Sequence, residues 1–207
     1  MTAFIGPNAI SRVLEAIDEA HGENAVAIVL ERAGLMHYAG MRPANPVPEA
    51  DVTALHAAAR SVLGPEHFGF VMRRAGKATA EYLIFNRIPT LLQGLIRLLP
   101  ARLGARLLLT EIGKNAATFG GSGAFTAHGW YPITITIRDN PLTRGQTASE
   151  PVCHYDAATF EQLFQRLVDP AISVKETTCE ATGDGACTFV LHWPGDDELR
   201  KSQENHG

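Results

Sequence analysis

The hydrophobic positions divide the chain into a helical first half and a strand-rich second half. Near the N-terminus, apolar residues such as Ile10, Val13 and Ile17 recur at the spacing of one helix face. The same periodicity predicts helices over about residues 23–33, 48–63 and 66–86, with Gly34 ending the first of these. Gly64 and Pro65 separate the other two, so we expect two distinct helices there.

The stretch over residues 82–109 is leucine-rich and contains four arginines and no acidic residue. Pro89 and Pro100 interrupt it, which predicts at least two short helices. One interpretation is a core helix pair with arginines at its edge. Another is an apolar groove rimmed by guanidinium groups, which suits a large, flat ligand bearing carboxylates. Leucine-rich basic helices also lie at lipid interfaces, so a peripheral membrane surface is a further candidate partner. The arginines are Arg87, Arg97, Arg102 and Arg106.

Alternating residues in the second half indicate strands over 124–130 and 133–138, the latter reading Ile-Thr-Ile-Thr-Ile from Ile133. Residues 140–145 are typical of a turn or mobile loop. A helix is expected from about 153 to 167, followed by a hairpin that ends near Trp193. Helices followed by β-β-α-β-β predict an α+β fold with an antiparallel sheet. We expect one domain over residues 1–195, with its N-terminal helices within 7–119 and a polar tail over 196–207.

Composition narrows the class of protein. The 207 residues include 22 acids and 18 bases, and the net charge of −4 argues against bulk nucleic-acid binding. Three cysteines do not make a secreted disulfide framework. The N-terminus lacks the basic region and apolar core of a signal peptide, and no run of apolar residues is long enough to span a bilayer. These features predict a cytoplasmic protein.

The cysteines and one glutamate form the most informative pattern, Cys153-x22-Glu176-x2-Cys179-x7-Cys187. Three thiolates and a carboxylate make a tetrahedral set that favours zinc. Two alternatives stay open: a disulfide between Cys179 and Cys187, or three unrelated cysteines packed as small apolar residues. A tight Gly-Asp-Gly turn would pair Cys187 with Ala181. Glu176 would face away from Cys179 in a regular strand, so the metal site requires a bulge or a strand start near Thr177.

The segment Cys179-Glu-Ala-Thr-Gly-Asp-Gly-Ala-Cys187-Thr-Phe resembles the 4-vinyl-reductase domain family of small ligand-binding domains. In phenol-sensing members, three cysteines and one glutamate hold zinc at this spacing. The resemblance therefore implies a zinc ion on the four residues of the pattern. Because the protein would fill all four positions, the ion would be structural.

Further segments resemble the bacteriochlorophyll-biosynthesis members of the family, and together they cover nearly the whole chain. The resemblance implies a helical layer on a four-stranded antiparallel sheet and a homodimer formed through the N-terminal helices. It also implies a magnesium tetrapyrrole as ligand and bacteriochlorophyll biosynthetic enzymes as partners. The segments are Ile5-Gly-Pro-Asn-Ala-Ile10, Ala33-Gly-Leu35 with Tyr38, Ala80-Glu-Tyr-Leu83, Asn86-Arg-Ile-Pro89, Leu98-Leu-Pro100 and Phe119-Gly-Gly-Ser-Gly123.

Candidate tetrapyrrole contacts follow from residue chemistry. The four arginines could bind propionates, His128 or His154 could be the axial ligand of magnesium, and three aromatic residues could stack on the macrocycle. Those aromatic residues are Phe119, Phe125 and Trp130.

Reduction of a vinyl group needs a hydride source, and the sequence carries no nicotinamide or flavin fingerprint. The glycine-rich segment over residues 120–123 follows a predicted helix and precedes a strand, the reverse of a dinucleotide loop. The favoured hypothesis is therefore a non-enzymatic carrier of a tetrapyrrole intermediate that assists 8-vinyl reduction or neighbouring steps. The alternatives are the divinyl (proto)chlorophyllide 8-vinyl (4-vinyl) reductase itself, with an external electron donor, and a small-molecule sensor or assembly module.

Overall fold

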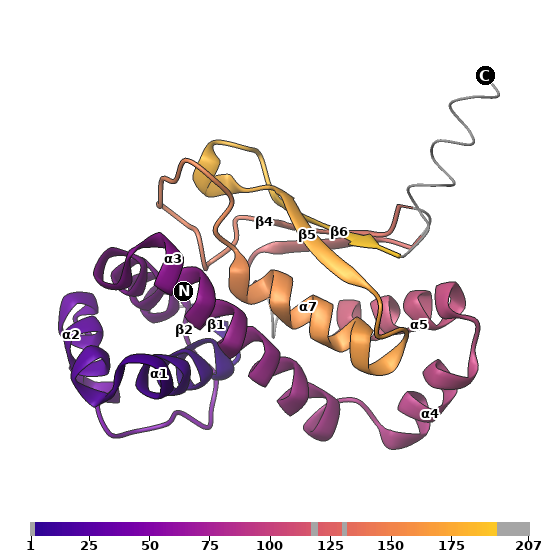
Figure 1. Ribbon diagram of the computed structural model, residues 1–207, viewed down its shortest axis with the longest axis horizontal. Helices are drawn as coiled ribbons and strands as arrows, with labels where there is room; N and C mark the ends of the chain where they lie inside the picture. Colours follow the sequence, from indigo (N-terminus) through magenta and orange to yellow (C-terminus); the bar gives the residue numbers. More distant parts are fainter. Residues whose placement is uncertain (1–2, 117–119, 130–131, 194–207) are drawn as a thin grey trace.

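The computed structural model describes residues 3–116, 120–129 and 132–193 (Figure 1). Its first half is helical, as predicted, and the helix boundaries fall at the expected glycines and prolines. A short ladder joins β1 (Phe4–Ile5) to β2 (Val47–Pro48) beside these helices. The helices are α1 (Asn8–His21), α2 (Glu23–Ala33), the 3-10 helix η1 (Met36–Tyr38), α3 (Glu49–Asn86), α4 (Thr90–Leu98) and α5 (Ala101–Lys114).

Helix α3 differs from the expected pair of separate helices. Its 38 residues continue through a kink at Gly64, where φ is 75° and ψ is 166°. Glycine adopts this positive φ readily, and Pro65 then takes an early position of the next helical segment, where its missing N–H is not needed. The two apolar patterns in the sequence are thus the two arms of one kinked helix.

The second half forms a four-stranded antiparallel sheet in the order β3-β4-β6-β5. Helix α7 (His154–Leu167) covers one face of the sheet (Figure 1). Buried residues alternate along the central strands, so Ile135 of β4 and Phe189 of β6 pair on the inward face. The strands are β3 (Ala124–His128), β4 (Thr134–Arg138), β5 (Ser173–Thr178) and β6 (Cys187–His192).

Helix α3 belongs to two hydrophobic cores, one with α1 and α2 and one with α5, α7 and the sheet. It lies close to α7, because a Cβ atom at Gly76 would clash with the carbonyl oxygen of Tyr155. The buried Thr79 and Tyr155 hydroxyl groups, 2.7 Å apart, form a hydrogen bond in the same helix contact. This contact fixes the start of α7 relative to the helical half.

The predicted fold class is confirmed: the chain is α+β, with a helical N-terminal part and a four-stranded antiparallel sheet. The predicted hairpin turn is wrong, because Cys187 pairs with Ile137 of β4, and Ala181 lies in the 3-10 helix η2 (Glu180–Thr182). The predicted tail over residues 196–207 lies outside the described residues. In the described part of the chain, no helix combines the length and apolar character needed to cross a membrane.

Candidate metal centre

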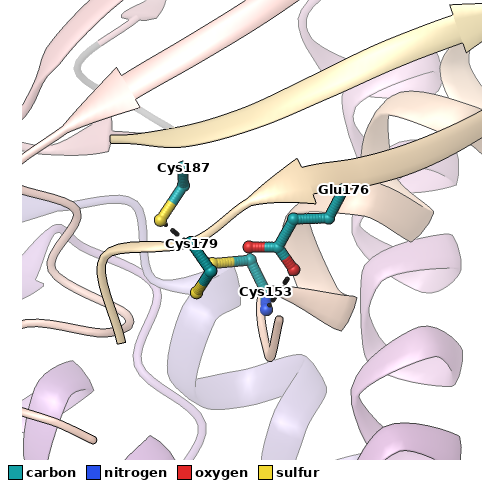
Figure 2. A group of neighbouring side chains, drawn as sticks. All are labelled: Cys153, Glu176, Cys179 and Cys187. Carbon is teal, nitrogen blue, oxygen red and sulfur yellow. Dashed lines mark hydrogen bonds between the residues drawn. The ribbon is translucent and has the colours of Figure 1, made fainter. Parts of the chain in front are cut away.

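The four predicted ligand groups converge beneath the end of the sheet, although they come from different elements (Figure 2). Cys153 precedes α7, Glu176 lies on β5, Cys179 follows β5, and Cys187 begins β6. The Sγ atom of Cys153 is 3.3 Å from that of Cys187 and 3.8 Å from that of Cys179. One candidate ligand atom from each residue lies within 4.8 Å of all the others. Sulfur ligands of a tetrahedral zinc, each about 2.3 Å from the ion, lie roughly 3.8 Å apart.

Local irregularities of the hairpin aim Glu176 and Cys179 at the same point. The β5–β6 register shifts between Glu176 and Thr178, which confirms the irregularity that the metal hypothesis required. The Asp184 carboxylate then accepts hydrogen bonds from the Cys179 backbone N–H (2.9 Å) and the Thr182 hydroxyl (2.8 Å). Gly183 takes a left-handed conformation at φ 94°, which closes this loop.

The electrostatics of the cluster favour a bound cation. Burial raises the pKa of Glu176 to about 8 and raises the pKa of the Cys153 thiol. Hydrogen bonds from the Cys153 and Cys187 thiols lower the pKa of Cys179. The hydrogen bond with Cys153 lowers the pKa of Cys187, but its interaction with Cys179 and its burial outweigh this and raise it to about 12. Without a cation the cluster therefore retains protons, and a divalent ion would displace them.

Glu176 provides a direct test of whether these residues fit a metal ion. Its Oε2 atom accepts the Cys153 backbone N–H at 2.8 Å. Its buried Oε1 atom has no hydrogen-bond partner among the residues that the structure describes. An unpartnered buried oxygen is costly, and metal coordination would satisfy it. Three cysteines and Glu176 could therefore hold an ion with all four tetrahedral positions filled by protein, as in a structural site.

A second layer of polar groups surrounds the thiols, and no pattern in the sequence pointed to it. The Asn140 side-chain amide points at the Cys153 Sγ atom (3.7 Å) and donates to the Asp156 carboxylate (2.9 Å). The Thr143 hydroxyl lies 3.6 Å from the Cys187 Sγ atom. Asn140 and Thr143 are buried within the segment that the sequence suggested was a turn or mobile loop. Such partners orient metal ligands and stabilise their negative charge.

A buried carboxylate also ties the helical half to the sheet. Glu49, at the start of α3, accepts hydrogen bonds from the backbone N–H and the hydroxyl of Ser122. It also forms an ion pair with Arg144 at 3.0 Å, and Arg144 in turn contacts Asp139 at 2.7 Å. This network places the 139–144 segment, and with it Asn140, over the thiol cluster.

Two of the predicted ligand contacts meet in a groove between α5 and β3. The groove encloses about 540 Å³ and includes Arg106 and Phe125. Phe125 and Ala127 share one face of β3, so strand alternation directs His128 to the opposite face. Leu103 and Gly129 also line the groove.

The other predicted contacts lie elsewhere. His154 lines a separate pocket of about 220 Å³ together with Phe68. Arg97 is exposed on α4, and Arg102 is exposed near the start of α5. Arg87 borders a pocket of about 240 Å³ beside β1. Phe119 and Trp130 lie outside the described residues.

Comparison with known proteins agrees with this architecture. Residues 133–193, which include the whole β4–α7–β5–β6 unit, match the 4-vinyl-reductase (V-4-R) domain family. An H-NOX protein from K. algicida has the same fold, with a TM-score of 0.61 at 10% identity over 91% of this chain and 96% of that one. The fold and the site thus define a 4-vinyl-reductase-domain protein of H-NOX-like architecture with a Cys3Glu cluster that could hold a metal.

Full-length relatives identify the family. The bacteriochlorophyll synthase 23 kDa chain of Cereibacter sphaeroides is 43% identical over 190 residues, which cover 90% of this chain and 89% of that protein. The protein of the same name from Rhodobacter capsulatus is 39% identical over 207 residues, covering 98% and 93%. The chain belongs to the family of bacteriochlorophyll synthase 23 kDa chains.

Proposed function

We propose that this protein binds a magnesium tetrapyrrole intermediate of bacteriochlorophyll biosynthesis and carries it between enzymes of that pathway without transforming it. The name of its full-length relatives supports the pathway. A solved structure with a TM-score of 0.56 comes from a study of heme distortion in the H-NOX family. At 11% identity that likeness concerns the fold, so no residue role is transferred from it.

The observation that carries the proposal is the groove between α5 and β3. Its volume of about 540 Å³ is within the range of about 300–1,000 Å³ that is usual for small-molecule sites. Leu103, Leu107 and Phe125 provide apolar and aromatic surface for a flat macrocycle. Arg106 adds a guanidinium group suited to a propionate. A Cβ atom at Gly129 would lie 3.4 Å from the Arg106 side chain, so glycine leaves room for that side chain.

We further propose that the Cys3Glu cluster holds zinc in a structural role. The ion would connect Cys153, at the start of α7, to the β5–β6 hairpin. It would thereby stabilise the sheet whose β3 edge forms one wall of the groove. The three free thiols suit a reducing compartment, which supports a location in the cytoplasm. The proposal includes a homodimer joined through the N-terminal helices, with about twice the 22.3 kDa chain mass in light scattering.

The decisive experiment is an absorbance titration of the purified protein with magnesium protoporphyrin. We expect a shift of the Soret band that saturates at one ligand per chain. Ala127→Trp fills the groove from an exposed position and should weaken binding by about tenfold or more. Thr126→Trp is the matched control, because it adds the same bulk to the opposite face of the same strand and should leave binding unchanged.

A second titration with divinyl protochlorophyllide and NADPH separates carrier from enzyme. A carrier leaves the divinyl pigment unchanged over hours. Conversion to the monovinyl pigment would establish the reductase and refute the carrier. The absence of any Soret shift would refute tetrapyrrole binding and favour the sensor or assembly role.

A further inference from the structure

Helix α4 presents an apolar face to solvent. Leu91, Leu95 and Leu98 are 90%, 50% and 85% exposed, and their spacing places them on one side of the helix. Phe85, at the end of α3, is 77% exposed, and Leu103 of α5 is about half exposed. These five residues define the α4 patch, and α4 lies at the end of the molecule remote from α1 and α2 (Figure 1).

The α4 patch is carried by a helix that is firmly attached to the protein. Ile96 is buried on the opposite side of α4, and Gly104 allows α5 to approach the Ile96 carbonyl oxygen. The Gln93 side-chain amide donates to the carbonyl oxygens of Ile84 (2.7 Å) and Ile88 (2.9 Å), which joins α4 to the end of α3. The exposed leucines are therefore held outward by fixed contacts.

The charge around the α4 patch indicates its partner. Residues 82–110 contain four arginines and no acidic residue, in a chain of net charge −4. The flanking acids have their own cationic partners: Glu81 pairs with Arg166 and Glu111 with Lys114, each at 3.1 Å. A basic zone on an otherwise acidic molecule is complementary to an anionic surface, and the acidic remainder would be repelled from that surface.

We propose that the α4 patch docks on an anionic lipid bilayer. Helix α4 would lie in the plane of the interface, with Leu91, Leu95 and Leu98 among the acyl chains, as amphipathic interfacial helices do. The guanidinium groups of Arg87 and Arg97 would meet the lipid phosphates. Leu103 belongs both to the α4 patch and to the groove, so a docked molecule would hold one end of the groove at the lipid surface. Only this last link to ligand exchange rests on the proposed function.

The test is flotation of the purified protein with vesicles of phosphatidylcholine alone and of phosphatidylcholine mixed with phosphatidylglycerol. We expect binding to the mixed vesicles that weakens as salt is raised. The double variant Leu91→Ser/Leu98→Ser should lower the partition coefficient by about tenfold or more. Arg87→Gln/Arg97→Gln should weaken binding to the mixed vesicles by several-fold. Both changes lie on the surface, so circular dichroism should report an unchanged fold.

The matched control is Ile28→Ser/Phe70→Ser, which removes two other apolar side chains that are more than half exposed and lie outside the α4 patch. It should bind vesicles like the wild type. Failure of the wild type to float with either vesicle, or equal flotation of the Leu91/Leu98 variant, would overturn the proposal. A change in oligomeric mass in that variant, without vesicle binding by the wild type, would instead identify a protein interface. The Soret titration of the same variant should be unchanged, which separates docking from ligand binding.

Discussion

Replacing Cys187 by serine is the sharpest test of the metal centre. The change keeps nearly the same shape at a fully buried position of β6. It removes one of three thiolates, and a neutral hydroxyl is a poor ligand for a soft divalent ion. Cys153, Glu176 and Cys179 would remain, so the fourth tetrahedral position would lose its ligand.

The magnitude follows from linkage between metal binding and folding. A metal present at about a thousand times its dissociation constant stabilises the folded state by about 4 kcal/mol. The buried serine hydroxyl adds a penalty of about 1 kcal/mol, limited because the Thr143 hydroxyl lies near the Cys187 Sγ position. The free energy of unfolding should thus fall by about 5 kcal/mol. For a chain of this size, that loss corresponds to a decrease in Tm of about 10–20 °C.

The assay combines elemental analysis with thermal unfolding followed by circular dichroism. The wild type should contain one zinc ion per chain, and a strong chelator should lower its Tm nearly to that of Cys187→Ser. The variant should contain no zinc and be insensitive to the chelator. The control is Ile135→Val, a buried change on the adjacent strand β4 that costs about 1 kcal/mol. It should retain both the zinc and the response to the chelator.

Two results would refute the reasoning. The first is wild-type protein without stoichiometric metal whose Tm ignores the chelator. The second is a Cys187→Ser variant that still binds one ion per chain with unchanged affinity. Titration of thiols in denaturant without reductant distinguishes the disulfide alternative, because a metal site leaves all three cysteines free and a disulfide leaves one.

Three other variants test the surroundings of the site and the helical core. Asn140→Ala removes the amide that points at the Cys153 thiol, and should lower zinc affinity by about tenfold in a competition titration with a chromogenic chelator; unchanged affinity would contradict a role for that amide. Burial lowers the pKa of His56 to about 4. Because unfolded chains take up this proton near pH 6.5, stability should fall by about 3 kcal/mol between pH 6.5 and 4. His56→Gln should flatten that part of the urea-denaturation profile, and an unaltered slope would refute the assignment. Glu49→Gln weakens the buried ion pair with Arg144 and should cost about 2 kcal/mol in urea denaturation, whereas a neutral effect would show that the network is dispensable.

Much of the fold could be predicted because the relevant signals are local. The apolar repeat and its terminating glycines placed α1 and α2, and Pro89 and Pro100 placed the limits of α4 and α5. The Ile-Thr alternation placed β4 with its buried face. Local signals were weaker at Gly64, since a glycine followed by proline is compatible with both a helix end and a kink.

The order of residues was enough to establish the helical first half, the strand-rich second half and the identity of four candidate metal ligands, because periodicity and residue chemistry act over short stretches. The assembled fold was needed to establish the pairing of β4 with β6, the positions of Asn140 and Thr143 beside the thiols, and the groove between α5 and β3. Those features depend on contacts between residues far apart in the chain. Their energies come from burial and packing of the assembled layers, which no short stretch of sequence encodes.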